Sequence, residues 1–187
     1  MQHSRNRVVI GVVALVAVQA VAIGIYLGVE RSRDRASAKE VFRVEKVGGE
    51  KLAPDIMLER ADGTRVSVHG FGSRIRLVHF WATWCPPCVE ELPGLLAAAA
   101  EFADRGLTVA AISMDGDWAA IRDFFKGDIP HTVYRAVESD GHERYDIFSL
   151  PDTYLVSRDG WLLFRYGGAR DWASKSAREH LRRVLEP

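Results

Sequence analysis

The chain has 187 residues, of which 48% are hydrophobic, and its 25 basic and 25 acidic side chains leave no formal net charge. This length suits one domain of ordinary size together with a further segment. The balanced charge lacks the basic excess of proteins that bind nucleic acid, so the composition gives no reason to expect such a partner.

A long apolar run near the N-terminus is the first recognisable segment. It covers residues 8–29, is interrupted only by Gln19, and has arginines on both sides. A helix needs about 20 apolar residues to cross a bilayer, whereas the apolar part of a signal peptide has about 7–15. We therefore predict a transmembrane anchor over residues 8–29 after a short flank of residues 1–7. A signal peptide cleaved at Ala20 is the alternative, and the arginines on both sides leave the membrane orientation undecided.

Residues 30–49 predict a tether, because they are rich in charge, lack an apolar period and end in two glycines. Residues 50–187 then form the one globular domain that the sequence indicates. This domain begins with a hairpin signal, in which residues 53–58 and 64–68 flank Asp62-Gly63.

The next two elements carry both cysteines of the chain. Residues 76–80 predict a strand buried on both faces, and the residues from Cys88 to Arg105 predict a helix that stops at Gly106. Cys85 is therefore expected to cap the helix. Pro93 lies inside the helix, where a proline bends the axis.

Strands and helices alternate in the rest of the domain, which predicts an α/β fold with a parallel core. The expected elements, in chain order, are a strand at 107–113, a helix from Asp117, a strand at 131–137, a turn at 139–141, a short helix at 142–148, a hairpin of strands at 153–157 and 161–166, and a last helix capped by Asp171.

The spacing Cys85-Pro86-Pro87-Cys88 predicts a redox-active pair. Partial positive charge at a helix N-terminus stabilises a thiolate, so Cys85 is expected to ionise more readily than a free thiol. Cys88 lies one turn further on, where its sulfur can attack a mixed disulfide on Cys85 and release the bound protein.

Other roles fit this spacing less well. A disulfide across so short a loop removes only about 2 kcal/mol of unfolded-state entropy. Zinc needs a third or fourth ligand, and attachment of haem needs a histidine where Val89 stands. Metal binding remains the alternative to redox chemistry.

The segment Phe80 to Pro93, which reads FWATWCPPCVEELP, resembles the active-site segment of the thioredoxin superfamily, and within it the membrane-anchored TlpA/ResA/CcmG-type thiol-disulfide oxidoreductases. The similarity runs from about Leu52 to Leu185. It implies a thioredoxin-like fold, in which a central mixed β-sheet is flanked by helices and the first hairpin is an addition. It also implies a cis peptide before Pro151, a proline that faces the cysteines, and a Leu150 backbone that pairs with an extended substrate.

Two residues are expected to handle protons beside the sulfurs. Glu91 stands where ResA-like proteins have an acidic residue, and a buried carboxyl there would have a raised pKa and act as a general acid or base. The alternative is a first-turn acid that the helix dipole favours. His79 stands where thioredoxin has a buried aspartate, and it either takes the proton of Cys88 or is a hydrogen-bonded core residue.

Other side chains are expected to tune or border the pair. Asp152 replaces the hydroxyl residue usual after the proline, and a carboxylate near Cys85 would disfavour the thiolate unless it faces solvent. An apolar rim for a substrate peptide is expected from Trp84, Leu150 and the prolines Pro86 and Pro87, while Trp81 packs at the rim or beneath the site.

The resemblance implies a single-pass protein of the inner, cytoplasmic membrane whose redox domain faces the periplasm or cell exterior. Its expected role is to reduce exported proteins such as apocytochrome c, and its expected electron donor is a membrane carrier of the DsbD/CcdA type. No cofactor and no metal are expected. The alternatives are a copper-handling or chaperone-like binding module that uses Cys85, Cys88 and a histidine, a peroxidase, and a domain that faces the cytoplasm.

Overall fold

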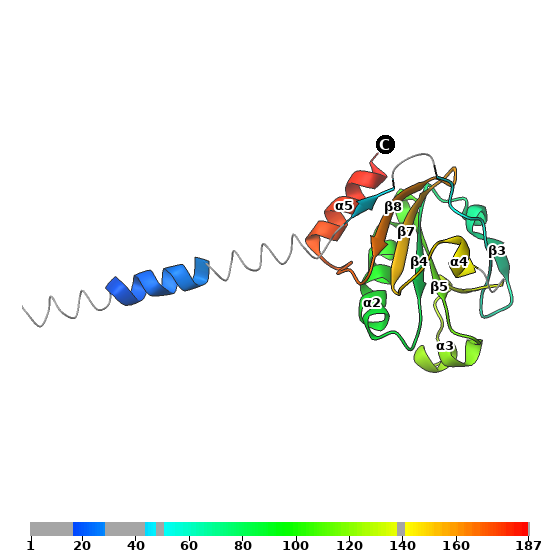
Figure 1. Cartoon of the computed structure of the whole chain (residues 1–187), viewed down its shortest axis with the longest axis horizontal. Helices are drawn as coiled ribbons and strands as arrows, with labels where there is room; N and C mark the ends of the chain where they lie inside the picture. Colours follow the sequence, from blue (N-terminus) through cyan, green and yellow to red (C-terminus); the bar gives the residue numbers. More distant parts are fainter. Residues whose placement is uncertain (1–16, 29–43, 48–50, 138–140, 187) are drawn as a thin grey trace, which may run out of the picture. The chain divides into compact units, whose positions relative to one another are not determined.

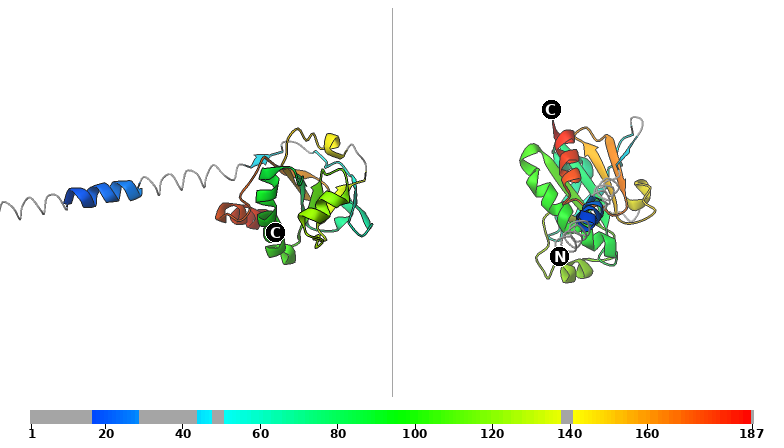
Figure 2. Two further views of the ribbon diagram at one scale, coloured as in Figure 1. Left: turned by 90° about the horizontal axis from the view of Figure 1, so that it is seen from below. Right: turned by 90° about the vertical axis from the view of Figure 1, so that its left-hand side faces the viewer.

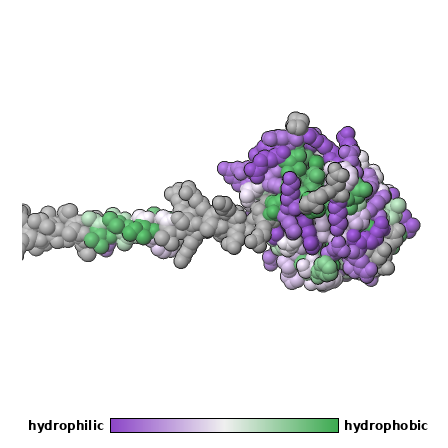
Figure 3. Space-filling view, turned by 45° about the horizontal axis from the view of Figure 1, so that its top comes forward, coloured by the Kyte–Doolittle hydropathy of each residue, from purple (hydrophilic) through white to green (hydrophobic). Residues whose placement is uncertain are grey.

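The computed structural model describes residues 17–28, 44–47, 51–137 and 141–186. The chain divides into two compact units, Met1–Val41 and Phe42–Pro187. In the first unit, residues 17–28 are helical and expose large apolar side chains, which colour this helix green in Figure 3: Val18, Val21, Ile23, Ile25 and Leu27. Among the described residues no helix has the length and apolar character to cross a bilayer. Residues 8–16 and 29 of the predicted anchor lie outside the described residues.

An eight-stranded mixed sheet forms the centre of the second unit (Figure 1). Its strands are β1 (Glu45–Lys46), β2 (Met57–Glu59), β3 (Arg65–Ser67), β4 (Ile75–Trp81), β5 (Leu107–Ser113), β6 (Val133–Ala136), β7 (Asp152–Ser157) and β8 (Leu162–Gly167). The spatial order is β1-β8-β7-β4-β5-β6-β2-β3, in which β4, β5 and β6 are parallel and the other neighbours are antiparallel. The predicted mixed sheet, with its added hairpin of β2 and β3, is confirmed.

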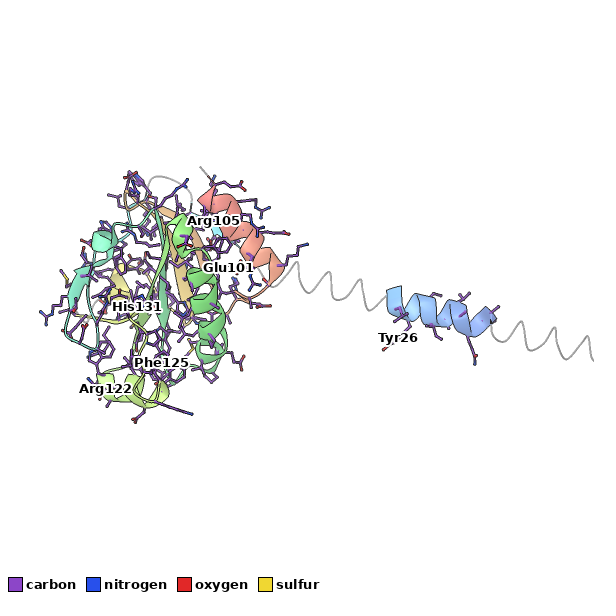
Figure 4. All side chains as sticks on the ribbon, turned by 180° about the vertical axis from the view of Figure 1, so that it is seen from behind. Tyr26, Glu101, Arg105, Arg122, Phe125 and His131 are labelled. Carbon is purple, nitrogen blue, oxygen red and sulfur yellow. A yellow bond between two sulfur atoms is a disulfide. The ribbon has the colours of Figure 1, made fainter. Side chains whose placement is uncertain are left out.

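Helices pack on both faces of this sheet. The helical elements are the 3-10 helices η1 (Val68–Phe71) and η2 (Ala103–Arg105) and the α-helices α2 (Pro86–Glu101), α3 (Trp118–Phe124), α4 (Gly141–Arg144) and α5 (Lys175–Leu185). Apolar residues of α2, α3 and α5 join one core cluster, and η1 and the residues around α4 join a second on the opposite face. Figures 1 and 2 show α2 and α5 together on one side and α4 on the other. An ion pair of 2.7 Å between Glu101, labelled in Figure 4, and Arg178 links α2 to α5.

Strand β4 is buried on both faces, as predicted. Because successive side chains of a strand point to opposite faces, Leu77, His79 and Trp81 turn toward the layer of α2, and Val78 and Phe80 turn toward η1 and α4. This alternation decides which residues of β4 can reach the cysteines.

Three predicted helix boundaries are wrong. α2 ends at Glu101 instead of Arg105, because residues 103–105 tighten into η2 before Gly106, whose φ of 87° terminates it. The helix predicted at 142–148 is confined to α4. The last helix is capped by Ser174, whose hydroxyl accepts the N–H of Ala177 at 3.1 Å. Asp171 instead accepts the N–H of Ala173 in the preceding turn.

Two residues of the predicted tether belong to the sheet. Glu45 and Lys46 form β1 and pair with Arg165 and Phe164 of β8. Backbone pairing of this kind needs no apolar pattern, which is why the charged sequence gave no strand signal. Residues 30–43 and 48–49 of the predicted tether, and residues 139–140 of the predicted turn, lie outside the described residues.

Candidate active site

The two cysteines lie where β4 leads into α2. Cys85 is the N-cap of α2, as predicted, and a disulfide of 2.04 Å joins it to Cys88. Cys85 is 6% exposed and lines a cavity, whereas Cys88 is 0% exposed. A substrate sulfur therefore reaches Cys85 first.

Pro86 and Pro87 occupy the first two helical positions, where a missing N–H costs no intrahelical hydrogen bond. The next two backbone N–H groups, of Cys88 and Val89, donate to the carbonyl of Cys85 at 3.0 and 3.1 Å. These two N–H groups are therefore used in backbone hydrogen bonds, so the helix dipole is what stabilises a Cys85 thiolate.

A cavity of about 500 Å³ opens beside Cys85. Pro86 lines it, whereas Pro87 is not part of the lining. Trp84 and Phe148 are 66% and 90% exposed, which is unusual for large hydrophobic side chains. None of the residues that line the cavity is Lys, Arg, Asp or Glu; they are Trp84, Cys85, Pro86, Met114, His142, Ile147, Phe148, Ser149 and Leu150.

The peptide bond between Leu150 and Pro151 is cis, as the family resemblance implied. Pro151 is buried directly before β7, and its carbonyl accepts the N–H of Gly168 at 2.9 Å. Leu150 lines the cavity next to Cys85. The loop and the cysteines therefore border the same opening.

Glu91 of α2 and His79 of β4 face each other in the core. Glu91 lies one turn after Cys88 on the buried face of α2, and its Oε1 is 3.6 Å from Nδ1 of His79. Burial raises the pKa of Glu91 to about 7, although the backbone N–H of Arg170 and the side chain of Trp172 stabilise the ionised form. Burial lowers the pKa of His79 to about 3, so its ring is neutral near pH 7.

Asp152 does not face solvent, which was one of its two expected positions. It pairs in the sheet with Phe80, so its side chain lies on the face opposite α2, and it is 1% exposed. Its Oδ2 is 2.7 Å from Nη2 of Arg165 on β8 and 3.3 Å from the hydroxyl of Tyr154. The guanidinium offsets the carboxylate charge, which weakens any effect of Asp152 on the sulfurs.

Three side chains that matter for the site were not predicted from the sequence. Asp115 follows β5 and binds Thr83 in the turn that leads to Cys85. Thr153 lies 2.8 Å from Nδ1 of His79, and Phe148 borders the cavity. An acidic residue at the carboxyl end of a parallel strand, as Asp115 is, was the available clue, because the ends of neighbouring parallel strands lie together.

Of the two positions expected for Trp81, at the rim or beneath the site, it takes the second and is fully buried. Its ring centroid lies 5.5 Å from that of Phe124 and 5.9 Å from that of Phe125, which Figure 4 labels at the end of α3. Within the described part of the chain, no group of three or more His, Cys, Asp or Glu side chains is arranged to hold a metal ion.

A model of the AhpC/TSA family matches residues 50–164. Among curated proteins, the thiol-disulfide oxidoreductase ResA of Bacillus thuringiensis subsp. konkukian is 24% identical over 143 residues, which cover 75% of this chain and 80% of that protein. ResA of Oceanobacillus iheyensis is 28% identical over 130 residues, or 67% of each chain.

Solved structures share the fold. A thiol:disulfide interchange protein from Bacteroides sp. aligns with a TM-score of 0.62 and 24% identity over 74% of this chain and 91% of its own. A thiol:disulfide interchange protein of the thioredoxin family from Chlorobium tepidum TLS aligns with a TM-score of 0.63 and 21% identity over 75% and 99%.

Proposed function

Because the chain belongs to the AhpC/TSA family and is similar to ResA proteins, we propose that it is a membrane-anchored reductant of disulfide bonds in exported proteins. Thiol-disulfide oxidoreductase activity itself follows from the family match, from the relatives named for it and from the disulfide at the start of α2. The observation that carries the assignment of roles is the unequal burial of Cys85 and Cys88.

The reaction begins from the reduced pair. The thiolate of Cys85 attacks one sulfur of a substrate disulfide, forms a mixed disulfide and displaces the other substrate sulfur as a thiolate. Cys88 gives its proton to the ionised carboxyl of Glu91 and then attacks the sulfur of Cys85. This step closes the Cys85–Cys88 disulfide and releases the second substrate thiolate, so two electrons pass to the substrate. The proton that a released thiolate takes up can come from Glu91.

The cavity beside Cys85 supports a polypeptide substrate with uncharged residues next to its cysteine. Its lining contains no Lys, Arg, Asp or Glu and carries two exposed aromatic side chains, Trp84 and Phe148. Alanine at either position is expected to lower kcat/KM for a peptide disulfide about fivefold, because each ring contributes on the order of 1 kcal/mol of contact. The rate with a small aromatic disulfide reagent should stay unchanged. Trp161→Ala, at an exposed tryptophan outside the cavity, is the matched control.

The location and partners are part of the proposal. The apolar sequence of residues 8–29 and the exposed apolar side chains of residues 17–28 support a membrane anchor. We place the redox domain in the periplasm or at the cell exterior, with apocytochrome c among its substrates and a carrier of the DsbD/CcdA type as its electron donor. The similarity to ResA proteins supports this part.

Trapping tests the assignment of the cysteines. Full-length chain with Cys88→Ala should accumulate mixed disulfides on Cys85, detected by non-reducing electrophoresis and mass spectrometry, and exported cysteine-containing proteins should be among the adducts. Cys85→Ala is the matched control and should give none. Equal adducts in both variants, or none in either, would show that the roles are assigned wrongly.

A redox titration tests the direction of electron flow. A reduction potential near the value of thioredoxin, about −270 mV, supports a reductant, and a value near that of the strongest oxidant of the group, about −120 mV, contradicts it. Stoichiometric copper binding by the reduced chain without disulfide exchange would favour a binding module instead. Rapid oxidation by hydroperoxides without reaction with peptide disulfides would favour a peroxidase.

A further inference from the structure

His79 and Thr153 face each other on neighbouring strands. β4 and β7 pair with these two residues in register, and Nδ1 of the ring lies 2.8 Å from the threonine hydroxyl oxygen. Both residues are completely or almost completely buried. The other ring nitrogen, Nε2, has no hydrogen-bond partner among the described residues. Nδ1 is therefore the nitrogen through which this ring acts.

Glu91 approaches the same nitrogen from α2. Its Oε2 accepts the backbone N–H of Arg170, which fixes the carboxyl, and its Oε1 lies 3.6 Å from Nδ1 of His79. The Glu91 side chain is 3% exposed and that of His79 is 0% exposed, so water does not compete for this contact. Nδ1 thus has two oxygens within reach, one neutral and one that ionises.

We propose that His79 is a positioning residue for Glu91: the Thr153 hydroxyl accepts the Nδ1–H and so keeps the proton on that nitrogen, and the same N–H donates a hydrogen bond to Glu91 when the carboxyl ionises. A neutral imidazole carries one N–H, so its donor position has to be selected by a partner. Only the consequence for exchange kinetics rests on the proposed oxidoreductase function.

The surroundings make Glu91 the member of the pair that titrates. Burial keeps His79 neutral, with its pKa lowered to about 3, and raises the pKa of Glu91 to about 7. Other ionisable groups lie on the elements that pack against the pair, and Tyr166 pairs in register with Thr153. α2 contributes Cys88, which is held in the disulfide, β8 contributes Tyr166, whose pKa is raised by burial, and the loop after β8 contributes Arg170. β5 contributes Ala111 opposite His79.

The proposed step is a proton transfer from Glu91. Protonated Glu91 gives its proton to a thiolate, and the carboxylate left behind accepts a hydrogen bond from Nδ1–H. No proton leaves His79, and no electron moves in this step. The ring lowers the free energy of the ionised acid, because a hydrogen bond to a charged group is stronger than one to a neutral group.

The test follows the carboxyl of Glu91 by ¹³C NMR in the oxidised full-length chain, where no substrate is needed. His79→Leu should raise the pKa of Glu91 by about one to two pH units, the equivalent of a hydrogen bond to a charged group. His79→Asn should keep it close to the wild-type value, because the amide N–H replaces Nδ1–H. If the two variants raise the pKa equally, the proposal is wrong.

Thr153 provides a second test that leaves His79 intact. In Thr153→Val the proton of the His79 ring is free to move to Nε2, and Nδ1 can then accept a hydrogen bond from protonated Glu91. This stabilises the neutral acid, so the pKa of Glu91 should rise. Thr153→Ser keeps a hydroxyl and should leave the pKa at its wild-type value. Thr108 on β5 carries a comparable hydroxyl, which donates to the hydroxyl of Ser73 at 2.8 Å, and Thr108→Val should leave the pKa of Glu91 unchanged. An unchanged pKa in Thr153→Val would overturn the selection of the donor nitrogen.

The pH profile of peptide-disulfide exchange separates the two hypotheses. Its midpoint should move with the pKa of Glu91 across these variants, which a purely structural role of His79 would not produce. If the NMR values move and the exchange profile does not, Glu91 is not the proton donor in the proposed reaction, and the pairing of His79 with Glu91 stands.

Discussion

Asp115 holds Thr83 by two hydrogen bonds: Oδ1 accepts the hydroxyl at 2.6 Å and Oδ2 accepts the backbone N–H at 3.0 Å. Ser113 donates to the same carboxylate at 2.6 Å. Because Thr83 precedes Cys85 by two residues, this buried carboxylate sets the approach of the chain to the disulfide.

Asp115→Ala should lower the free energy of unfolding by about 2–4 kcal/mol, since three hydrogen bonds to a charged group are lost. Peptide exchange should slow as well, because Cys85 loses its support. Urea denaturation and exchange kinetics measure the two effects. Asp123→Ala, at an exposed carboxylate on α3, should change neither. Full activity in Asp115→Ala would show that the turn keeps its shape unaided.

Asp152→Asn should separate stability from reactivity. The substitution removes the buried carboxylate that is the ionic partner of Arg165, whose side chain is 31% exposed. We therefore expect a loss of about 1–3 kcal/mol in the free energy of unfolding. The pH profile of Cys85 alkylation should be unchanged, because Asp152 lies on the other face of the sheet. A shifted profile would restore the prediction that Asp152 tunes the thiolate.

Glu91 should make stability depend on pH. Its pKa rises from 4.5 to about 7 on folding, so the native state binds more protons than the unfolded state between these values. The contribution of Glu91 is present below pH 4.5 and is lost as the pH rises to about 7. His79 and His180, whose pKa values are lowered by burial, act in the opposite direction, His79 between about pH 3 and 6.5 and His180 between about pH 4 and 6.5.

The difference in unfolding free energy between wild type and Glu91→Gln isolates this effect. Wild type should lose about 3 kcal/mol relative to the variant between pH 4 and pH 8, an upper limit from the pKa values. Denaturation at a series of pH values in that interval provides the measurement. A constant difference would mean that Glu91 does not titrate with a raised pKa.

Pro87→Ala should make Cys85 more reactive. Alanine adds an N–H at the second helical position, which an N-cap side chain can accept, and this stabilises the thiolate. We expect about three- to tenfold faster alkylation near neutral pH, the effect of one hydrogen bond, and a weaker reductant. Pro86→Ala is the matched control, because an N–H at the first position does not point at the cap. Equal rates for both variants would contradict this geometry.

Local patterns predicted the part of the site that lies within one stretch of chain. The strand, the N-cap cysteine and the start of α2 follow each other from Ile75 to Cys88, so periodicity and spacing were sufficient. The end of α2 was not predictable in the same way, because the sequence from Glu101 to Arg105 is compatible with either an α-helix or the tighter η2.

Contacts between distant strands were not predictable from one sequence. Thr83 and Asp115 are 32 residues apart, and His79 and Thr153 are 74 apart, so only the register of the sheet brings them together. Asp152 shows the same limit at short range. Its partner Arg165 is 13 residues away, but the face on which both lie depends on the pairing of β7 with β8.

The two outer strands of the sheet have a consequence for the proposed reaction with protein disulfides. β1 and β3 lie at the two edges, have two and three residues, and include charged side chains at Glu45, Lys46 and Arg65. Short, charged edges discourage an extended chain from adding as a further strand. A client segment is therefore kept from adhering along the sheet and is left with the opening beside Cys85, where contact can end in a chemical step and release.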